Sequence, residues 1–588
     1  MRLAFDIETD GLLRNLTKIH CIVAQDLDTN EVYKFDGTGD HPSIREGLAL
    51  LKDADELWGH NIIGYDFEAI KEVFPRWNYS STVYDTLILS RLFFTDLLDR
   101  DFRSRPANMP AQLYGRHSLE AWGHRLSVHK SEFGKSLSGD WSTYSPEMLD
   151  YCARDVVVSV SLARLFTAKV AEYRDCISTE HRLATIMAWQ ESEGFPFDVA
   201  KAERLEGQLR SELLKLSEQM RETFPYVDGG SFTPRTNNGP RGYVKGAAMC
   251  RLKEFNPTSR QHIAWAFATF RDWEPKELTD TGKPKIDETT LLEYGTDEAK
   301  TFARILELQK HLGQLSEGAN AWLKKVESDG RIHHSCVLNT NTGRQAHMKP
   351  NLAQVPSGHE YRELFHPGAN RSQVGADASG LELRCLGHYL ARFDGGKFAK
   401  EVVQGDIHTA LAEIYGTDRK SGKGVTYCLI YGGGDSKLGL TAGASKAQAV
   451  KKGKEIRSRI MANLDGFAAL NAAVQERAKS GVLKGLDGRP IRLQGKNHAA
   501  LNYLLQSAGA VICKLWLLRS YELLDEAGID YFPMAFVHDE VHISVAPSQA
   551  EQAGQLIQIA MKDVEHQIKF RCALDSEYQI GNSWADCH

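Results

Sequence analysis

In the segment Arg419–Gly432, four side chains are spaced so that an α-helix would place them along one face. Four of its side chains recur every four residues: Arg419, Lys423, Tyr427 and Tyr431. Four helical residues turn the chain about 40° beyond a full rotation, so these side chains share one stripe along an α-helix. Cations bind phosphates and flat rings stack on bases or sugars, so the stripe favours a nucleotide ligand. A surface helix with a half-buried aromatic face is the alternative.

The predicted helix carries two further signals. Thr417 or Asp418 is expected to cap its first turn, since both side chains accept hydrogen bonds from free backbone amides. Gly422 and Gly424 flank Lys423, and each costs about 1 kcal/mol relative to alanine inside a helix. We therefore expect the start of the helix to be loosened.

Length, composition and cysteine usage set broad bounds. A chain of 588 residues exceeds what one hydrophobic core supports, so roughly two to four domains are expected. The net charge of −6 neither indicates nor excludes a nucleic-acid partner. No continuous apolar run reaches the roughly 18 residues of a membrane span, and the start lacks a signal-peptide pattern. The 10 cysteines form no CxxC pair, which fits a reducing cytoplasm and argues against a structural zinc site.

Carboxylates gather in the amino-terminal third. Arg2–Thr9 is predicted to be a buried strand, on which Asp6 and Glu8 share one face because side chains alternate. Two adjacent carboxylates on an apolar strand repel each other and lose hydration, and a divalent cation relieves both costs. Asp66 lies where a helix is expected to begin. Asp85 follows another apolar run and is interpreted as a capping or supporting acid, not as a metal ligand.

A tyrosine and a further carboxylate lie on a predicted helix. Tyr151 and Asp155 are four residues apart and so share one helical face. Together with the earlier carboxylates, Asp155 would complete sites for two cations about 4 Å apart that bridge a scissile phosphate. The phenol of Tyr151 would orient a water molecule. Four acids on solvated surfaces are the alternative.

The middle of the chain changes to helical periodicity. From about residue 177 to 326, apolar residues recur at three and four positions, which predicts long amphipathic helices. A segment rich in Gly, Pro and Asn interrupts them. All charged residues between 229 and 253 are basic: Arg235, Arg241, Lys245, Arg251 and Lys253. A flexible basic loop fits a phosphate backbone or a partner protein, and a solvated charge run is an equal alternative.

Two more carboxylates lie at predicted strand ends in the carboxy-terminal half. Asp377 ends a strand that a short turn joins to a helix bearing Glu382, and Asp539 lies at the tip of a hairpin. Although distant in sequence, both are expected to converge across one sheet. Two cations held there would activate a primer hydroxyl and bind a nucleoside triphosphate. Polar side chains within residues 331–356 suit a minor groove, where acceptors are nearly uniform among base pairs.

Five motifs resemble, in order, those of family A (Pol I type) DNA polymerases: DASGLELR at 377–384, GDIHT at 405–409, RxxxKxxxYxxxYG at 419–432, LNYLLQSAGA at 501–510 and VHDE at 537–540. The amino-terminal DxE, Asp and YxxxD resemble 3′–5′ proofreading exonucleases of the ribonuclease-H-like DnaQ type. The terminal WADCH, HSLEAWGHRL at 117–126 and TGRQAH…PNLAQVP are similar to the replicative enzymes of T-seven-like short-tailed phages.

The resemblance implies an α/β multidomain fold. A ribonuclease-H-like exonuclease domain, residues 1–175, would precede a right-hand polymerase domain, residues 176–588. The latter would contain a thumb at about 195–328, fingers at about 386–499, and a palm at about 329–385 and 500–588. The implied activity is template-directed DNA synthesis with 3′–5′ proofreading, in phage genome replication. A repair or gap-filling polymerase, an RNA-synthesising enzyme and a non-catalytic DNA-binding scaffold are the alternatives.

The resemblance also implies a role for each matching residue. The polymerase metals would be bound by Asp377, the Ala378 carbonyl and Asp539, with Glu540 and His588 nearby. The exonuclease metals would be bound by Asp6, Glu8, Asp66 and Asp155, and Tyr151 would orient the water. The incoming nucleotide would contact six residues: Glu382 and Tyr427 at the sugar, His408, Arg419 and Lys423 at the phosphates, and Tyr431 near the templating base. The primer–template would contact Arg344, Asn502, Gln506 and His538.

The implied cofactor is Mg²⁺, two ions in each site, with Mn²⁺ able to replace it. The implied partners are primer–template DNA, deoxynucleoside triphosphates, a helicase–primase and a processivity factor, with no membrane. Phage relatives carry a long thumb insertion that binds host thioredoxin. The corresponding segment, residues 225–254, is much shorter here, so the resemblance does not imply thioredoxin. The expected location is the cytoplasm of an infected bacterium.

Overall fold

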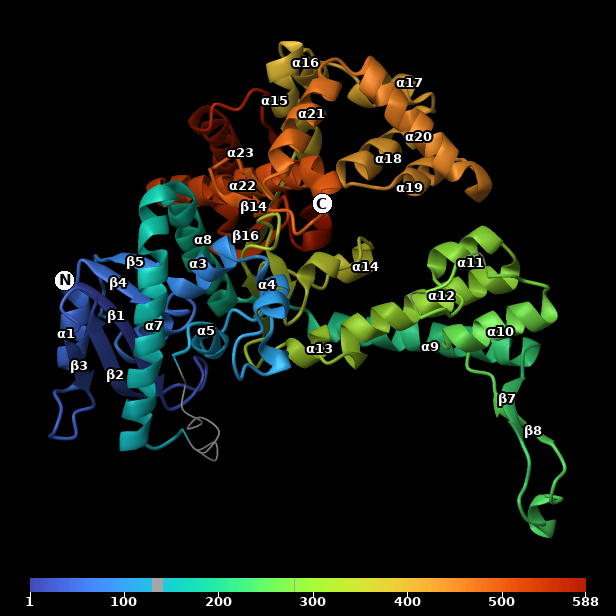
Figure 1. Ribbon diagram of the computed structural model, residues 1–588, viewed down its shortest axis with the longest axis horizontal. Helices are drawn as coiled ribbons and strands as arrows, with labels where there is room; N and C mark the ends of the chain where they lie inside the picture. The colour runs from blue at the N-terminus through green and yellow to red at the C-terminus, as the bar shows by residue number, and fades with distance from the viewer. Residues whose placement is uncertain (129–140, 276, 280, 588) are drawn as a thin grey trace. The chain divides into compact units, whose positions relative to one another are not determined.

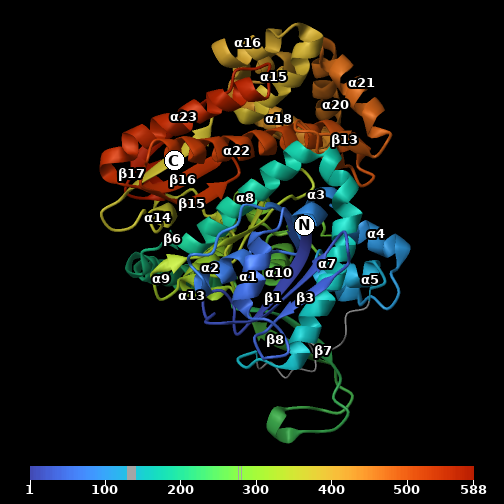
Figure 2. The same cartoon turned by 90° about the vertical axis from the view of Figure 1, so that its left-hand side faces the viewer.

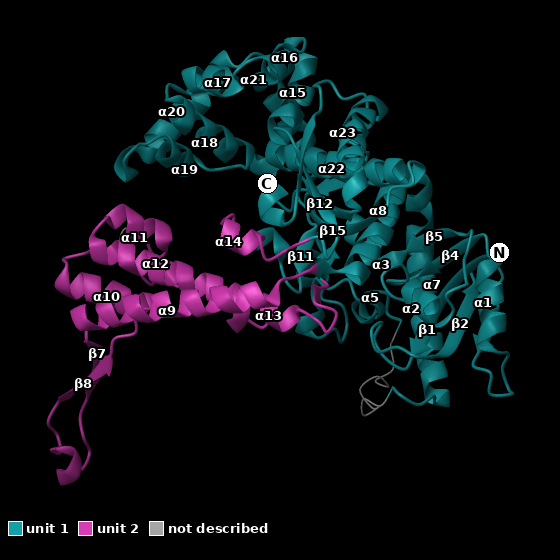
Figure 3. Ribbon diagram, turned by 180° about the vertical axis from the view of Figure 1, so that it is seen from behind, with its two compact units in different colours: residues 1–195, 334–355, 367–588 teal, residues 196–333, 356–366 magenta. Residues whose placement is uncertain are grey.

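The computed structural model describes residues 1–128, 141–275, 277–279 and 281–587 (Figure 1). His588, expected near the polymerase metals, lies outside these ranges. The chain forms two compact units (Figure 3). Unit 1 comprises residues 1–195, 334–355 and 367–588, and unit 2 comprises residues 196–333 and 356–366.

A five-stranded mixed sheet occupies the amino-terminal part of unit 1, in the order β3–β2–β1–β4–β5. Its strands are β1 (Arg2–Thr9), β2 (Ile19–Asp26), β3 (Val32–Phe35), β4 (Glu56–Gly59) and β5 (Thr82–Asp85). The predicted strand over Arg2–Thr9 is confirmed. It pairs antiparallel with β2 and parallel with β4, so it lies in the middle of the sheet.

Helices cover both faces of this sheet (Figure 2). The helices of this part are α1 (Ile44–Lys52), α2 (Asp66–Val73), α3 (Thr86–Phe93), α4 (Leu97–Ser104), α5 (Leu119–Arg125), α7 (Pro146–Glu172) and α8 (Arg174–Glu193). α1 and α2 pack on the face that carries Ile7, and α7 packs on the face that carries Ala4. Because side chains alternate along β1, Asp6 and Glu8 share the α7 face.

A buried ion cluster joins α8 to the carboxy-terminal part of unit 1. The Oε1 atom of Glu180 lies 2.7 Å from both Lys514 Nζ and Arg489 Nη2, and Glu180 is fully buried. Arg489 also pairs with Asp487 at 2.7 Å. Burial lowers the pKa of Lys514 to about 8, against the opposing effect of Glu180. Removing one member of such a cluster leaves the others buried without compensation.

Replacement of Glu180 by Gln is therefore expected to lower the free energy of unfolding by about 3–5 kcal/mol. Urea unfolding followed by circular dichroism measures the change. The control is Glu522→Gln, which removes a partly exposed partner of Arg182 and should cost less than about 1 kcal/mol. Equal losses in the two variants would contradict a structural role for the buried cluster.

A four-stranded antiparallel sheet forms the centre of the carboxy-terminal part of unit 1, in the order β15–β16–β12–β17. Its strands are β12 (Ser372–Ala378), β15 (Tyr531–Val537), β16 (Glu540–Val545) and β17 (Ser576–Gly581). Two long helices, α22 (Ala500–Glu526) and α23 (Ala550–Gln567), pack on each other beside it. The predicted hairpin is confirmed, since only His538 and Asp539 separate β15 from β16.

Among the described residues, one stretch, Asn497–Glu526, is long and apolar enough to cross a membrane by length and composition alone. Polar residues interrupt this stretch, so it contains no long continuous apolar run. Of its most apolar window, 78% is buried in the protein. This burial is typical of the core helix of a soluble protein.

Residues 381–499 form a mostly helical region. Its elements are α15 (Leu381–Asp394), α16 (Lys397–Gln404), α17 (Ile407–Tyr415), α18 (Arg419–Ile430), α19 (Asp435–Thr441), α20 (Lys446–Asn463), α21 (Phe467–Ala478), β13 (Val482–Lys484) and β14 (Pro490–Arg492). The predicted helix at Arg419 is confirmed as α18, and Asp418 caps it by accepting a hydrogen bond from the Ser421 amide at 3.0 Å.

The two glycines of α18 have a packing role. A Cβ atom on Gly422 would lie 2.6 Å from the Ala412 Cβ on α17, and one on Gly424 would lie 2.9 Å from the Thr441 Cγ2 on α19. A Cβ atom at either position would force its neighbour to shift. The glycines therefore allow neighbouring helices to approach α18, and the helix runs unbroken through them.

Unit 2 is a helical arm with a projecting hairpin (Figure 3). Its elements are α9 (Val199–Thr223), β7 (Tyr226–Phe232), β8 (Met249–Glu254), α10 (Arg260–Phe270), α11 (Glu288–Tyr294), α12 (Asp297–Leu312), α13 (Trp322–Lys325) and α14 (His359–Arg362). The predicted long helices are confirmed. The expectation of a wholly flexible loop at 225–253 is wrong, because its two ends pair as antiparallel strands.

Candidate active sites

The first candidate site lies at one end of the four-stranded sheet. β12 carries Asp377 next to its end, and the β15–β16 turn carries Asp539. The backbone amide of Ala378 donates a hydrogen bond to the Asp539 carbonyl at 3.1 Å, which ties the turn to β12. The left-handed backbone of His538, with φ of 59°, makes a two-residue turn feasible. The two carboxylates predicted to converge are therefore neighbours.

Negative charge accumulates at this site. Loss of hydration raises the pKa of Asp377 to about 7, and the carboxylates of Asp539, Glu540 and Glu382 add to the effect. Burial and the charge of Glu382 likewise raise the pKa of Asp539 to about 6. Carboxylate oxygens and the Ala378 carbonyl are donors that suit a hard divalent cation, and such a cation would offset the repulsion.

Two further carboxylates stand beside Asp377 on the neighbouring strands. In the strand register Glu540 lies opposite it on β16, and Glu577 lies opposite it on β17. Glu540 Oε2 is 3.1 Å from the His542 Nε2 atom. Glu577 was not predicted from the sequence. It lies on the strand before the terminal WADCH motif, and only the pairing of β17 with β12 makes it significant.

A second group of predicted residues meets around Glu382, on the first turn of α15. The hydroxyl of Tyr431 donates a hydrogen bond to the Glu382 carboxylate. Arg344 Nη2 lies 3.8 Å from the same carboxylate, and its guanidinium carbon lies 5.9 Å from the centre of the Tyr431 ring. Burial and Glu382 raise the pKa of Tyr431 to about 12, so its hydroxyl stays protonated. Two segments that are distant in sequence, those of Arg344 and Tyr431, thus hold Glu382 in place.

The aromatic half of the stripe on α18 lies near Glu382 and near the carboxylates Asp377 and Asp539. The rings of Tyr427 and Tyr431 are stacked at 6.4 Å, and the His408 ring lies 6.3 Å from Tyr427. Burial raises the pKa of Tyr427, and the charges of Glu382, Asp539 and Asp377 contribute, which puts this phenol close to the carboxylates.

At the start of the stripe, Lys423 is exposed. Arg419 is paired with Asp406 at 2.8 Å, a partner that the sequence did not reveal. The pair is solvent-exposed and therefore weak, so a phosphate could replace the carboxylate.

The four residues predicted to contact DNA have different surroundings. Asn502 is buried and donates a hydrogen bond to the Ile430 carbonyl, while Gln506 donates to Asn502 at 3.3 Å. The side chain of Asn502 thus anchors the end of α18. His538 is exposed and its ring lies 6.3 Å from that of His347. Contacts of these residues with DNA stay predictions.

The second candidate site lies between β1 and α7. Asp6, Glu8 and Cys152 each offer one atom that could bind a metal, and these three atoms lie within 4.8 Å of one another. The Cys152 thiol also donates to the Asp6 carbonyl at 3.3 Å. Asp155 is buried one turn further along α7, where Tyr151 also lies. Cys152 was not predicted, although its place between Tyr151 and Asp155 could have indicated it.

Asp66 lies at the start of α2 and is almost completely buried. Burial and the neighbouring Asp85 raise its pKa to about 8, while the amide of Ile7, between Asp6 and Glu8, donates a hydrogen bond to it. Its Oδ1 atom has no hydrogen-bond partner among the described residues. A buried carboxylate oxygen in that state fits a cation ligand. The predicted capping role of Asp85 is confirmed by its hydrogen bond from the Leu87 amide at 2.9 Å.

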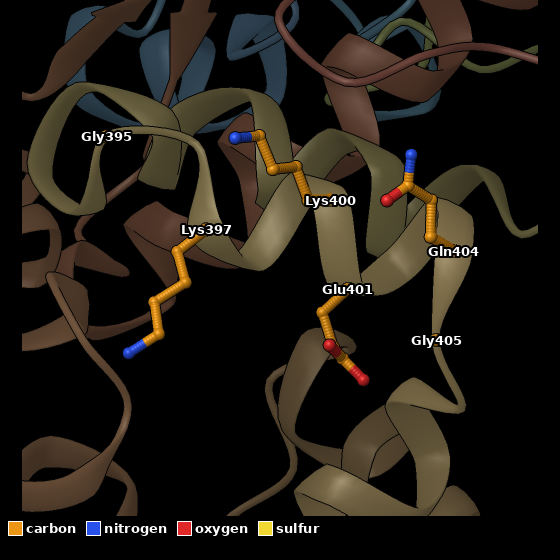
Figure 4. A pocket seen from close by; sticks show the side chains of 6 residues that line it. All are labelled: Gly395, Lys397, Lys400, Glu401, Gln404 and Gly405. Atoms are coloured by element: carbon orange, nitrogen blue, oxygen red, sulfur yellow. The ribbon is translucent and has the colours of Figure 1, made fainter.

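A surface pocket of about 340 Å³ lies beside α16 (Figure 4). It is lined by Gly395, Lys397, Lys400, Glu401, Gln404 and Gly405. None of the predicted site residues is among them, so concavity alone does not identify the chemistry of this chain.

Comparisons with known proteins indicate the same family that the sequence motifs resemble. The family model for DNA polymerase family A matches residues 244–586. The chain is 33% identical to the DNA-directed DNA polymerase of Enterobacteria phage T3, covering 100% of both chains, and 33% identical to that of Escherichia phage T7, covering 99% of both. The T3 alignment spans 719 positions, so that relative carries segments that this chain lacks.

A solved structure described as the POL domain of Pol1 from M. smegmatis, in complex with DNA primer-template and dNTP, has the same mixed α/β multidomain fold. The TM-score is 0.73 at 18% identity, over 99% of this chain and 96% of that one.

Proposed function

Because the chain belongs to DNA polymerase family A, we propose that Asp377, Asp539 and the Ala378 carbonyl form its polymerising centre. The chain is a DNA-directed DNA polymerase related to the replicative polymerases of phages T3 and T7. The observation that supports the assignment is the placement of the two carboxylates side by side at the sheet end, with raised pKa values.

Family A polymerases generally use divalent metal ions. We propose Mg²⁺, held by the Asp377 and Asp539 carboxylates and the Ala378 carbonyl. Bound cations of this kind favour ionisation of a primer 3′-hydroxyl and neutralise a triphosphate. Lys423 and Arg419 would bind the phosphates, with Arg419 exchanging Asp406 for a phosphate oxygen.

The sheet, the mostly helical region and unit 2 correspond in our proposal to palm, fingers and thumb. Unit 2, residues 196–333 and 356–366, nearly matches the range predicted for the thumb. Glu382 would lie against the nucleotide sugar and exclude a ribose 2′-hydroxyl. The hydroxyl of Tyr431 and the guanidinium of Arg344 fix the position of its carboxylate.

Tyr427 sets a testable preference for the nucleotide sugar. Its phenol is protonated and close to the carboxylates, so it can fill the place of a missing 3′-hydroxyl and satisfy the partners of that group. Tyr427→Phe is expected to use dideoxynucleotides roughly 10- to 100-fold less efficiently relative to deoxynucleotides. Single-nucleotide incorporation kinetics measure the ratio. An unchanged ratio in Tyr427→Phe would refute this role.

The amino-terminal site is proposed to be a 3′–5′ proofreading exonuclease. Asp6, Glu8, Asp66 and Asp155 would hold two Mg²⁺ ions, and Tyr151 would orient the attacking water. The buried Oδ1 of Asp66 supports this assignment, as does the proximity of the Asp6 and Glu8 carboxylates. The site removes misincorporated nucleotides only if the primer end reaches it, so proofreading rests on DNA moving between the two sites.

The β7–β8 hairpin is proposed to contact the DNA backbone. Its cations Arg235, Arg241 and Lys245 are exposed, and Arg251 lies 4.1 Å above the Phe232 ring. Changing the three exposed cations to Gln is expected to shorten products and to lower the slope of log Kd against log salt by up to about three. The control neutralises Lys18, Lys52 and Arg76 in the amino-terminal part. A slope unchanged in the hairpin variant would mean a solvated charge run.

We further propose that the enzyme replicates a phage genome in the cytoplasm of an infected bacterium. A helicase–primase and a processivity factor are its proposed partners, and the short hairpin argues against thioredoxin. Extension of a primed circular single strand, with and without added thioredoxin, tests this. Long products that do not depend on thioredoxin are expected. Short products under all salt conditions would favour the alternative, a gap-filling polymerase.

A further inference from the structure

Two histidines and a cysteine meet on one face of a small hairpin in unit 1, formed by β10 (Ser335–Val337) and β11 (Ala346–Met348). Cys336 and His347 lie directly opposite each other in the strand register. His334 precedes Cys336 by two residues and therefore shares its face. Neither candidate active site uses these residues.

The three side chains form a built cluster. One donor atom of each lies within 4.8 Å of the others, and Cys336 Sγ is 3.3 Å from His347 Nδ1. His334 is fully buried and its Nε2 atom lies 3.0 Å from the Gln190 amide on α8. The Nε2 atom of His347 is buried without a hydrogen-bond partner among the described residues. An imidazole nitrogen left in that state has a ligand to gain.

We propose that His334, Cys336 and His347 bind one zinc-class cation. Two imidazole nitrogens and a thiolate are ligands that zinc favours, whereas Mg²⁺ prefers the oxygen donors of the two carboxylate sites. Tetrahedral zinc keeps such donors roughly 3.4–3.8 Å apart, so separations within 4.8 Å would close by at most about 1 Å on binding. Cys336 releases its thiol proton to solvent as the bond forms. Gln190 orients His334 through its outer nitrogen, and water completes the coordination.

The cation would brace a segment that reaches the polymerising centre. Residues 338–345 connect the two strands and carry Arg344, which faces Glu382. Gln345, in the same segment, donates a hydrogen bond to the Phe536 carbonyl on β15 at 2.8 Å, and β11 and β15 both belong to unit 1 (Figure 3). The His347 ring lies 6.3 Å from that of His538 in the β15–β16 turn. The three ligands are thus positioning residues.

Cobalt binding to the full chain tests the site directly. Chelator-treated protein is titrated with Co²⁺ in excess Mg²⁺, which fills the carboxylate sites. We expect one equivalent to bind with a thiolate-to-cobalt charge-transfer band that added Zn²⁺ removes. Cys336→Ser should lose the band, while Cys152→Ser and Cys250→Ser should keep it. No band in the unmodified chain, or loss of the band in Cys152→Ser alone, would overturn the proposal.

Two further measurements separate binding from folding and from chemistry. His347→Ala is expected to weaken Co²⁺ affinity at least tenfold while the circular dichroism spectrum stays unchanged. The control is His498→Ala, which replaces an exposed histidine and should bind Co²⁺ as the unmodified chain does. Removal of the cation should raise KM for primer–template and leave kcat unchanged, because the brace positions Arg344. A fall in kcat at constant KM would contradict the bracing role.

Discussion

Replacement of Asp377 or Asp539 by Ala is expected to reduce primer extension by roughly 10³-fold or more, which corresponds to at least about 4 kcal/mol of activation free energy. The two carboxylates are neighbours at the sheet end, and both carry raised pKa values because they lose hydration and lie among other carboxylates. Either substitution removes a ligand of the proposed Mg²⁺ sites. Steady-state extension of a labelled primer measures the loss.

Binding of primer–template by these two variants should stay close to that of the unmodified chain, because the residues proposed to contact the DNA are unchanged. Fluorescence anisotropy with labelled DNA measures it. Asp530→Asn is the matched control. It removes an exposed acid, paired with Arg371, at the opposite end of the same hairpin, and should leave synthesis intact. Synthesis retained by Asp377→Ala would refute the metal assignment.

The double variant Asp6→Ala with Glu8→Ala is expected to lose 3′–5′ degradation of single-stranded DNA by roughly 10³-fold or more while keeping full polymerase activity. Both carboxylates lie on the α7 face of β1, and their removal abolishes the proposed cation sites there. Release of labelled nucleotides from a 3′ end, without deoxynucleoside triphosphates, measures the loss.

Two controls sharpen this test. Asp10 is a partly exposed acid just beyond β1 that accepts hydrogen bonds from the backbone amides of Thr17 and Lys18. Its replacement by Asn should leave degradation intact. Cys152→Ser keeps both carboxylates and reports whether the thiol matters. If synthesis and degradation fell together in the double variant, the assignment of two separate sites would be wrong.

Local patterns predicted the elements that carry the proposed chemistry. The four-residue spacing predicted α18, the alternation around Asp6 predicted β1, and two apolar runs predicted the turn at Asp539. The β7–β8 hairpin was missed because its Gly, Pro and Asn residues favour loops, while its pairing depends on strands that a long connection separates.

The surroundings of the site residues were less predictable. Asp406 beside Arg419, Glu577 beside Asp377 and Cys152 beside Asp6 each lie where a fold contact or a register brings them. The absence of CxxC pairs argued against a structural zinc site. His334, Cys336 and His347 nevertheless meet, because two short strands pair in one register. Such pairings arise between residues that no local pattern connects.

The sequence by itself determined the family, the kinds of side chain at each proposed site and the local elements that carry them, because residue type and short-range periodicity are properties of neighbouring residues. Only the tertiary structure decided which carboxylates lie close enough to raise one another's pKa values. It also decided that Asn502 anchors α18 and that Tyr431 and Arg344 hold Glu382. Burial and charge–charge distance set these properties, and both depend on strand register and helix packing between distant segments.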